Sequence, residues 1–238
     1  MRTYIAYAVG EIVLIMVGIL LALQIGNWNA SKAEQREVTE YLGSLREDFK
    51  ENLEDIELKI QLVSEVLENV TRLREKLSKD QIEIDLETFN KYFAQSMAIY
   101  TCNPTTKTYD ELISVGALRK INNRKLKNSL GEWKKQLDWL ERLEGDALRI
   151  RDNAVIPYLI EHSALGDAAT QLGDALVNYD RIKKGKFRTD IEELANDRGI
   201  DNVLVLQLIG HNELESEFQT TRILILEVNR LLEEALSN

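Results

Sequence analysis

The sequence contains very little cysteine, proline or histidine. Among 238 residues there are one cysteine, two prolines and two histidines. The lone Cys102 excludes a disulfide within the chain, and His162 and His211 lie too far apart for the Cys/His spacing of a zinc site. Because proline breaks the helical hydrogen-bond ladder, its scarcity leaves room for long helices. We therefore expect an all-α protein without a bound metal.

The chain also lacks an excess of positive charge. Its 40 acidic and 30 basic residues give a formal net charge of −10, which argues against a nucleic-acid partner, since phosphate binding needs a clustered basic face. The densest basic cluster is flanked by Asp110, Glu111 and Glu132. We interpret it as the solvated start of a helix and not as a phosphate site. It consists of Arg119, Lys120, Arg124, Lys125 and Lys127.

Signatures of catalysis are missing as well. The sequence has no phosphate-binding glycine loop, no Gly-x-Ser-x-Gly and no Glu-x-x-His pattern of carboxylate di-iron bundles. His211 falls on an apolar helical face, where the expected role is that of a hydrogen-bonded core histidine. We expect neither enzymatic activity nor a cofactor.

One long apolar run is present near the N-terminus. Ile5 to Ile25 comprise 21 residues with a single charge, Glu11, and a membrane-spanning helix needs about 20. The 12 Leu, Ile and Val residues of the run favour insertion by about 4–7 kcal/mol, whereas one acid at the bilayer centre costs about 3 kcal/mol. The run therefore predicts a transmembrane helix.

A cleaved signal peptide is the competing interpretation of this run. Small residues should then precede the cleavage site, but Asn27, Trp28 and Asn29 stand there. We therefore predict a transmembrane anchor over residues 1–30 and a helical domain outside the bilayer over residues 31–238.

The apolar run is not uniform around its helix axis. With about 100° per residue, five residues lie within about 60° of one line: Glu11, Ile15, Gly18, Ala22 and Gly26. The last three are either ordinary small residues or a ladder that lets two helices approach closely. We favour a self-association face with Glu11 turned inward, because a Glu that faces lipid is costly. The expected partners are thus the lipid bilayer and further copies of the chain.

Beyond this run, apolar residues repeat every seven positions in three stretches, which is typical of long helices packed lengthwise. The first stretch, Ala33 to Leu77, carries Leu42, Phe49, Ile56, Val63, Val70 and Leu77. The second carries Leu126, Trp133, Leu140, Ala147 and Ala154. The third, from about Ile200 to Leu236, carries Leu204, His211, Phe218, Ile225 and Leu232. We predict a long-helix antiparallel bundle or coiled-coil-like domain.

Shorter elements are expected between these helices. Helices are predicted over residues 86–100 and 108–115, and Gly116 is well placed to cap the second of them. Pro157 should kink or end the second long helix. The segment His162–Lys186, with three glycines, is the least helical part, and no segment reads as a strand.

Two segments are similar to a known family. Ala8 to Asn29, AVGEIVLIMVGILLALQIGNWN, resembles the opening of a family of single-span membrane proteins from Gram-negative bacteria, known as a domain of unknown function. The matching residues are Gly10, Glu11, Gly18, Gln24, Asn27, Trp28 and Asn29. Residues 108–122, TYDELISVGALRKIN, resemble its second hallmark through Tyr109, Leu112, Gly116, Leu118, Ile121 and Asn122.

The chain departs from the family in two respects. Gly26 stands where relatives carry Asn, and the basic extension that precedes the span in relatives is absent. The resemblance implies a single-pass protein of the bacterial inner membrane with a periplasmic domain, and it implies no activity. We expect the second motif to be structural, with a left-handed Gly116 and with Leu112, Leu118 and Ile121 packed in the core.

The leading hypothesis for function is a membrane-anchored, self-associating helical scaffold or sensor of the cell envelope. An unidentified protein partner or a ligand would then bind at the segment His162–Lys186. The alternative hypothesis is an ion-conducting or proton-coupled oligomer that uses Glu11, because acids within a membrane span are candidate functional residues.

Overall fold

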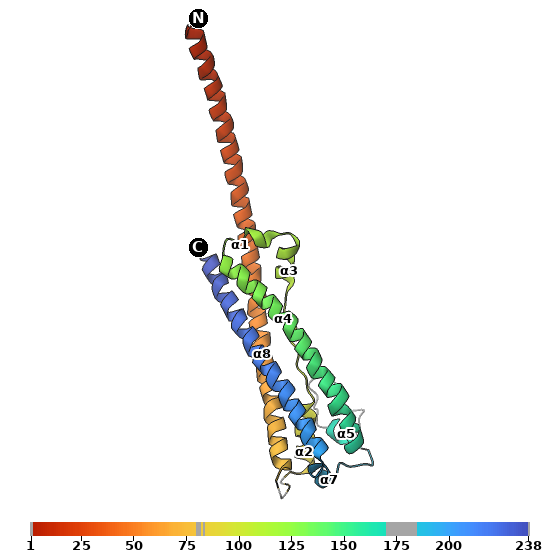
Figure 1. The fold of residues 1–238 in the computed structure, drawn as a ribbon. Coiled ribbons are helices and arrows are strands. Elements are labelled where there is room, and N and C mark those ends of the chain that lie inside the picture. Colours follow the sequence, from red (N-terminus) through yellow and green to blue (C-terminus); the bar gives the residue numbers. More distant parts are fainter. Residues whose placement is uncertain (1, 80–81, 83, 170–184, 238) are drawn as a thin grey trace.

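The described part of the chain folds into helices joined by short connections (Figure 1). The structure is a computed structural model and describes residues 2–79, 82, 84–169 and 185–237. The elements are α1 (Arg2–Leu77), α2 (Leu86–Ser96), α3 (Lys107–Ser114), η1 (Ala117–Lys120), α4 (Arg124–Ile150), η2 (Arg151–Val155), α5 (Ile156–His162), α6 (Leu165–Ala169), α7 (Ile191–Ala195) and α8 (Arg198–Leu236). These ranges contain no strand, so the protein is all-helical, as predicted.

Helix α1 is a single helix of 76 residues. Its first part projects beyond all other elements, and the remainder lies alongside them (Figure 1). The large apolar side chains described between residues 14 and 28 are exposed in the projecting part. By length and composition α1 is a candidate membrane span. The predicted boundary between residues 30 and 31 falls within α1, so no loop separates the projecting part from the rest.

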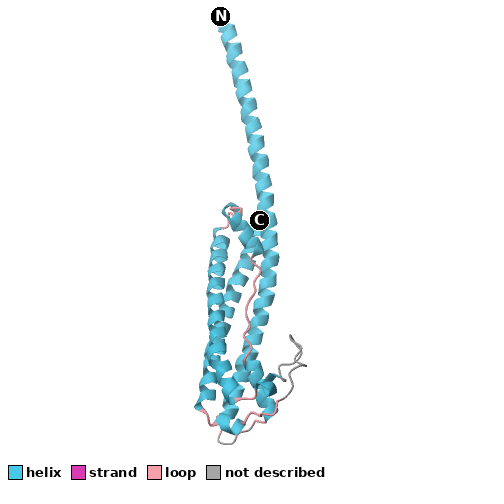
Figure 2. Ribbon diagram, turned by 90° about the vertical axis from the view of Figure 1, so that its right-hand side faces the viewer, coloured by secondary structure: helices cyan, strands magenta, loops and turns pink. Residues whose placement is uncertain are grey.

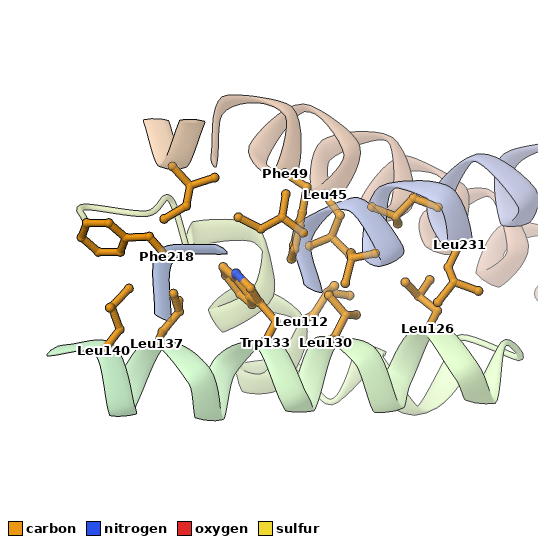
Figure 3. Close-up of a cluster of buried hydrophobic side chains, with 14 of the residues drawn as sticks. Leu45, Phe49, Leu112, Leu126, Leu130, Trp133, Leu137, Leu140, Phe218 and Leu231 are labelled. Carbon is orange, nitrogen blue, oxygen red and sulfur yellow. The ribbon is translucent and has the colours of Figure 1, made fainter. Parts of the chain in front are cut away.

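Helix α8 packs along both α1 and α4, and the three helices share a core (Figures 1 and 2). The sequence colours show that α1 and α4 run in one direction and α8 in the other. The residues of the three predicted seven-residue repeats are buried, except the half-buried Ala154. Phe49 of α1, Trp133 of α4 and Phe218 of α8 point into one interior (Figure 3), where the first two rings lie 4.6 Å apart.

Because α1 and α4 run in the same direction, the chain must return along the core between them. It does so through residues 97–106, an extended stretch that we call the return segment (Figure 2). The helix predicted over residues 86–100 corresponds to α2. Its predicted end at residue 100 is wrong, since α2 ends at Ser96. There, the side chain of Gln207 in α8 donates a hydrogen bond to the carbonyl oxygen of Ser96 and takes the place of a further helical turn.

The second long helix continues past Pro157. Of the two predicted outcomes, a kink or an end, the end is wrong: α4 passes through the π-helix η2 into α5, which begins just before Pro157. Because the proline ring collides with the carbonyl group four residues earlier, a wider π-turn lets the chain continue. Within the segment His162–Lys186, α6 is helical, and residues 170–184 lie outside the described residues. The short helix α7 was not predicted.

Candidate functional site

The second resemblance motif forms a corner at the end of the core from which α1 projects (Figure 1). This α3–η1 corner comprises residues 107–122. Leu112 and Ile121 are only 1% and 2% exposed, and they pack in the same cluster as Leu45 and Phe49 of α1. The corner is therefore part of the core through its apolar side chains.

The change in chain direction between α3 and η1 depends on Gly116. Its φ of 70° and ψ of 14° lie in the left-handed region, which glycine adopts without steric cost. The predicted left-handed conformation is thus confirmed. Leu118 is half-buried against the core, and the ring of Tyr109 meets that of Trp133 edge-on at 5.9 Å. Asn122 is exposed and lines a shallow groove beside α1.

An ion-pair cluster connects the corner to the part of α1 that leaves the core. Nζ of Lys120 lies 3.0 Å from Oε2 of Glu37 and 3.7 Å from Oε1 of Glu34. The hydrogen bond to Glu37 raises the pKa of Lys120 above its ordinary value. Because these side chains are partly exposed, the pairs orient the corner more than they stabilise the fold.

Two further contacts lie deeper along α1. The hydroxyl of Tyr41 donates to Oε1 of Glu111 at 3.3 Å, and the N–H of Thr108 donates to Oδ2 of Asp48 at 3.1 Å. Partial burial and the negative charge of Glu111 raise the pKa of Tyr41. Together with Lys120, these contacts bind the corner to α1 over about four helical turns.

Side chains of α1 and α4 bind the backbone of the return segment. Asn52 is almost fully buried and engages both groups of Thr105: Nδ2 donates to the carbonyl oxygen at 3.0 Å, and Oδ1 accepts from the N–H at 2.7 Å. Oε1 of Glu144 accepts from the N–H of Cys102 at 2.8 Å. Buried backbone groups need hydrogen-bond partners. These side chains supply the hydrogen bonds that a neighbouring strand would supply in a sheet.

Burial changes the acidity of the groups around Cys102. Desolvation raises the pKa of Glu144, and the hydrogen bond from Cys102 offsets part of this effect. Desolvation and the nearby Glu144 raise the pKa of the Cys102 thiol well above its ordinary value. The sulfur therefore stays protonated at neutral pH, where a thiol is a poor nucleophile. The hydrogen bonds from Asn52 and Glu144 therefore serve to position the return segment.

Helix α8 binds the beginning of the return segment. Nε2 of Gln207 donates to the carbonyl oxygen of Ser96 at 2.9 Å. The buried ring of His211 lies between two carbonyl oxygens, with Nδ1 2.8 Å from that of Gln207 and Nε2 3.1 Å from that of Ala98. A neutral imidazole donates to one of them and a protonated imidazole to both. The prediction of a hydrogen-bonded core histidine is confirmed.

The predicted self-association residues lie apart from this site. All five are exposed on the projecting part of α1, away from the other elements that the structure describes (Figure 1). A Cβ atom added to Gly18 or Gly26 would meet nothing within 4 Å. These residues are Glu11, Ile15, Gly18, Ala22 and Gly26. They connect to the α3–η1 corner through the continuous backbone of α1.

Sequence reasoning missed the polar side chains that bind the return segment. One signal was available for two of them. Asn52 stands three residues after Phe49 and four before Ile56, so it interrupts a predicted buried stripe. Gln207 has the same position between Leu204 and His211. A buried polar side chain needs a partner, although the sequence alone does not tell which one.

Comparisons with known proteins connect the two motifs to one family. Residues 11–146 match DUF6090, a family of unknown function. The match spans more than half of the chain and runs from the projecting part of α1 through the α3–η1 corner into α4. No curated protein and no solved structure matches the chain. The chain therefore belongs to the DUF6090 family.

Proposed function

We propose that the protein is a non-enzymatic, membrane-anchored scaffold or sensor of the cell envelope that self-associates through its N-terminal helix. The observation that carries this proposal is the continuity of α1. One helix contains both the exposed apolar stretch and a large part of the core. A displacement or rotation of the exposed part therefore moves the core-forming part with it.

Length and flanking residues support the anchor. The run from Ile5 to Ile25 is about 31 Å long at 1.5 Å per residue, which fits a hydrocarbon layer of about 30 Å. Directly after it, Nζ of Lys32 lies 4.0 Å from the centre of the Trp28 ring. Tryptophan and lysine are favoured at membrane–water interfaces. The proposed interface is therefore at residues 28–32.

The core supports a sensor role because α1 is bound on several sides. We treat the helices beyond residue 31 as one antiparallel, coiled-coil-like bundle built on α1. Asp48, Asn52 and the acids near Lys120 connect α1 to the corner and the return segment. Sliding or turning α1 would break these contacts, so a shift of the anchor reaches the rest of the domain.

The space around the small residues supports self-association. Among the described residues, nothing lies within 4 Å of a Cβ atom built on Gly18 or Gly26, so their lack of side chains serves no packing within that part of one copy. A second helix placed on Gly18, Ala22 and Gly26 would use that space for close backbone contact.

Gly18→Leu tests this proposal. Because the site is open within the chain, the substitution leaves the fold of one copy intact and separates the helices of two. We expect the detergent-solubilised complex to fall to the mass of a single chain. Val17→Leu, on another side of the same helix, is the matched control and should keep the mass of the wild type. A wild-type protein that is monomeric in both mild detergent and vesicles contradicts the proposal.

A second candidate function, ion or proton conduction by the oligomer, rests on Glu11. Its side chain is exposed and shares the helical line of Gly18, so self-association would bring the Glu11 residues of several copies together. Glu11→Gln keeps shape and hydrogen bonding and removes titration. Conduction requires that this variant lose ion flux across vesicles at unchanged oligomer mass. Equal flux for both proteins would leave Glu11 as a packing residue.

We further propose that the anchor lies in a bacterial inner membrane with the domain in the periplasm. Arg2, just before the apolar run, favours a cytoplasmic side for that end of the span by the positive-inside rule. A reporter that is active only in the cytoplasm, fused after Asn238, should be silent. A bright reporter would instead show that the domain lies in the cytoplasm.

A further inference from the structure

The sequence contains a stretch whose charge opposes that of the whole chain. From Leu112 to Gly131 there is no acidic residue, although the net charge of the protein is −10. The same stretch holds five basic residues: Arg119, Lys120, Arg124, Lys125 and Lys127. By sequence alone they read as a solvated helix start, so their meaning depends on where the fold places them.

The fold places these residues at the end of the core from which α1 projects. Element η1 and the first turn of α4 lie at this end, beside the C-terminal turns of α8 (Figure 1). Arg119, Lys120, Arg124 and Lys125 are exposed there, and Lys127 is half-buried. We call residues 113–127 the basic cap.

Of the five basic residues of the cap, only Lys120 forms ion pairs within 4 Å among the described residues, and Lys125 interacts with Glu227 of α8 at longer range. Lys120 pairs with Glu34 and Glu37, the acids that face the cap from α1. Among the described residues, no carboxylate lies within 4 Å of Arg119 or Arg124, and the same holds for Lys125 and Lys127. The guanidinium of Arg119 only approaches the carbonyl oxygen of Gly116, at 3.5 Å.

Two apolar side chains lie exposed in the same cap. Ile113 and Val115 lie just before the turn at Gly116 and are 50% and 57% exposed. Their neighbours Leu112 and Ala117 point into the core, so the turn presents its other apolar residues to the outside.

The distance along α1 places the basic cap near a bilayer. Glu34, which contacts the cap through Lys120, lies nine residues after Ile25, or about 13 Å along the helix. The headgroup layer fills about 5–8 Å of that distance. The remaining gap is comparable to the screening length of about 8 Å at physiological salt, so lipid phosphates and the cap attract each other.

We propose that the basic cap binds anionic lipid headgroups of the leaflet next to it. This proposal rests on the proposed function, because only a spanning α1 presents the cap to a membrane. The contact would hold the domain close to the bilayer and fix the tilt of α1 relative to it.

Hydrogen exchange of the full chain in lipid nanodiscs tests the proposal. One set of discs contains phosphatidylcholine alone, and the other contains phosphatidylcholine with phosphatidylglycerol. Backbone amides of residues 113–127 should exchange more slowly in the anionic discs. High salt should remove the difference. Each basic residue removed should weaken the contact about fivefold, so Arg124→Gln combined with Lys125→Gln should abolish the difference.

A matched control isolates the position of the charge. Lys91 and Arg198 are exposed at the opposite end of the core, and their double replacement by Gln should leave the lipid effect unchanged. Equal exchange in both kinds of disc overturns the proposal. So does equal slowing by inorganic phosphate added to the neutral discs, which would identify a site for free anions. If α1 does not span, the chain will enter neither disc, and the proposed function fails separately.

Discussion

At the scale of single residues, Asn52 links α1 to the return segment, and its contribution to stability can be measured. Its amide binds both backbone groups of Thr105, so Asn52→Leu leaves a partly buried donor and a partly buried acceptor without these partners. We expect the free energy of unfolding to fall by about 2–4 kcal/mol. Asn212→Leu is the control, since that exposed amide only binds the carbonyl oxygen of Leu208 in its own helix; it should change stability by less than about 0.5 kcal/mol.

Denaturant unfolding of the full chain in mild detergent, followed by circular dichroism, compares the two Asn variants. Equal losses for Asn52→Leu and Asn212→Leu would mean that the hydrogen bonds to Thr105 contribute nothing to stability. A large loss for Asn52 alone would show that the hydrogen bonds to Thr105 hold the connection between α2 and α3 in place.

Glu144 should make stability depend on pH. Burial raises its pKa in the folded chain above the ordinary 4.5, so the folded state binds this proton more tightly than the unfolded state. Stability from this group is therefore greatest below pH 4.5 and falls as pH rises through the raised folded pKa. Glu144→Gln keeps an acceptor for the Cys102 N–H and removes the charge.

The Gln variant should equal the wild type in stability below pH 4.5 and exceed it increasingly above. Unfolding curves of both proteins across that range measure the difference. Four other groups face Glu144: Glu141, Asp55, Lys59 and Cys102. They are present in both proteins, so their own contributions to stability cancel in the comparison. A difference that shrinks as pH rises would show that the charged form of Glu144 stabilises the fold.

At the scale of elements, the junction between α3 and η1 depends on one backbone conformation. Gly116 has a φ of 70°, which costs other residues about 1–2 kcal/mol and β-branched residues more. Gly116→Val should therefore destabilise the domain by at least that amount. Gly131 in α4 has open space where a Cβ would be added, so Gly131→Ala should stabilise it by about 0.5–1 kcal/mol. Thermal unfolding should thus shift in opposite directions.

The long helices could be predicted because their signal is local. A seven-residue apolar repeat, such as Leu42, Phe49 and Ile56, reports burial on one helical face whatever the partner is. The turn at Gly116 is local too, since a glycine after a short helix commonly takes the left-handed conformation. Both kinds of feature were found in the sequence and are present in the structure.

The end of α2 and the return segment could not be predicted, because contacts between distant residues decide them. Gln207 binds the carbonyl oxygen of Ser96, which is 111 residues away in the chain. Asn52 and Thr105 are 53 residues apart. No local pattern indicates that the backbone after Ser96 will leave the helix to be bound by side chains of three other helices.

At the scale of the whole molecule, the continuity of α1 connects the face of the span to a face of the domain. With about 100° per residue, Asn29 and Arg36 fall within about 20° of the line through Gly18. Arg36 is exposed, as are Glu54 and Arg72 farther along the same line. The side of the domain that would meet a second copy is therefore the solvent side of α1, and the core does not obstruct association through Gly18.

This geometry predicts the pattern of disulfide cross-links between copies. In a background with Cys102→Ser, Asn29→Cys and Arg36→Cys should each cross-link in vesicles, because both residues face the partner helix. Two alanines inserted after Ala30 turn everything beyond them by about 200°. Arg36→Cys should then stop cross-linking while Asn29→Cys continues. Seven inserted alanines turn the helix by about 700°, close to two full turns, and should restore the Arg36→Cys cross-link. If Arg36→Cys cross-links equally with zero, two and seven inserted alanines, α1 does not transmit rotation, and the sensor role proposed for it fails.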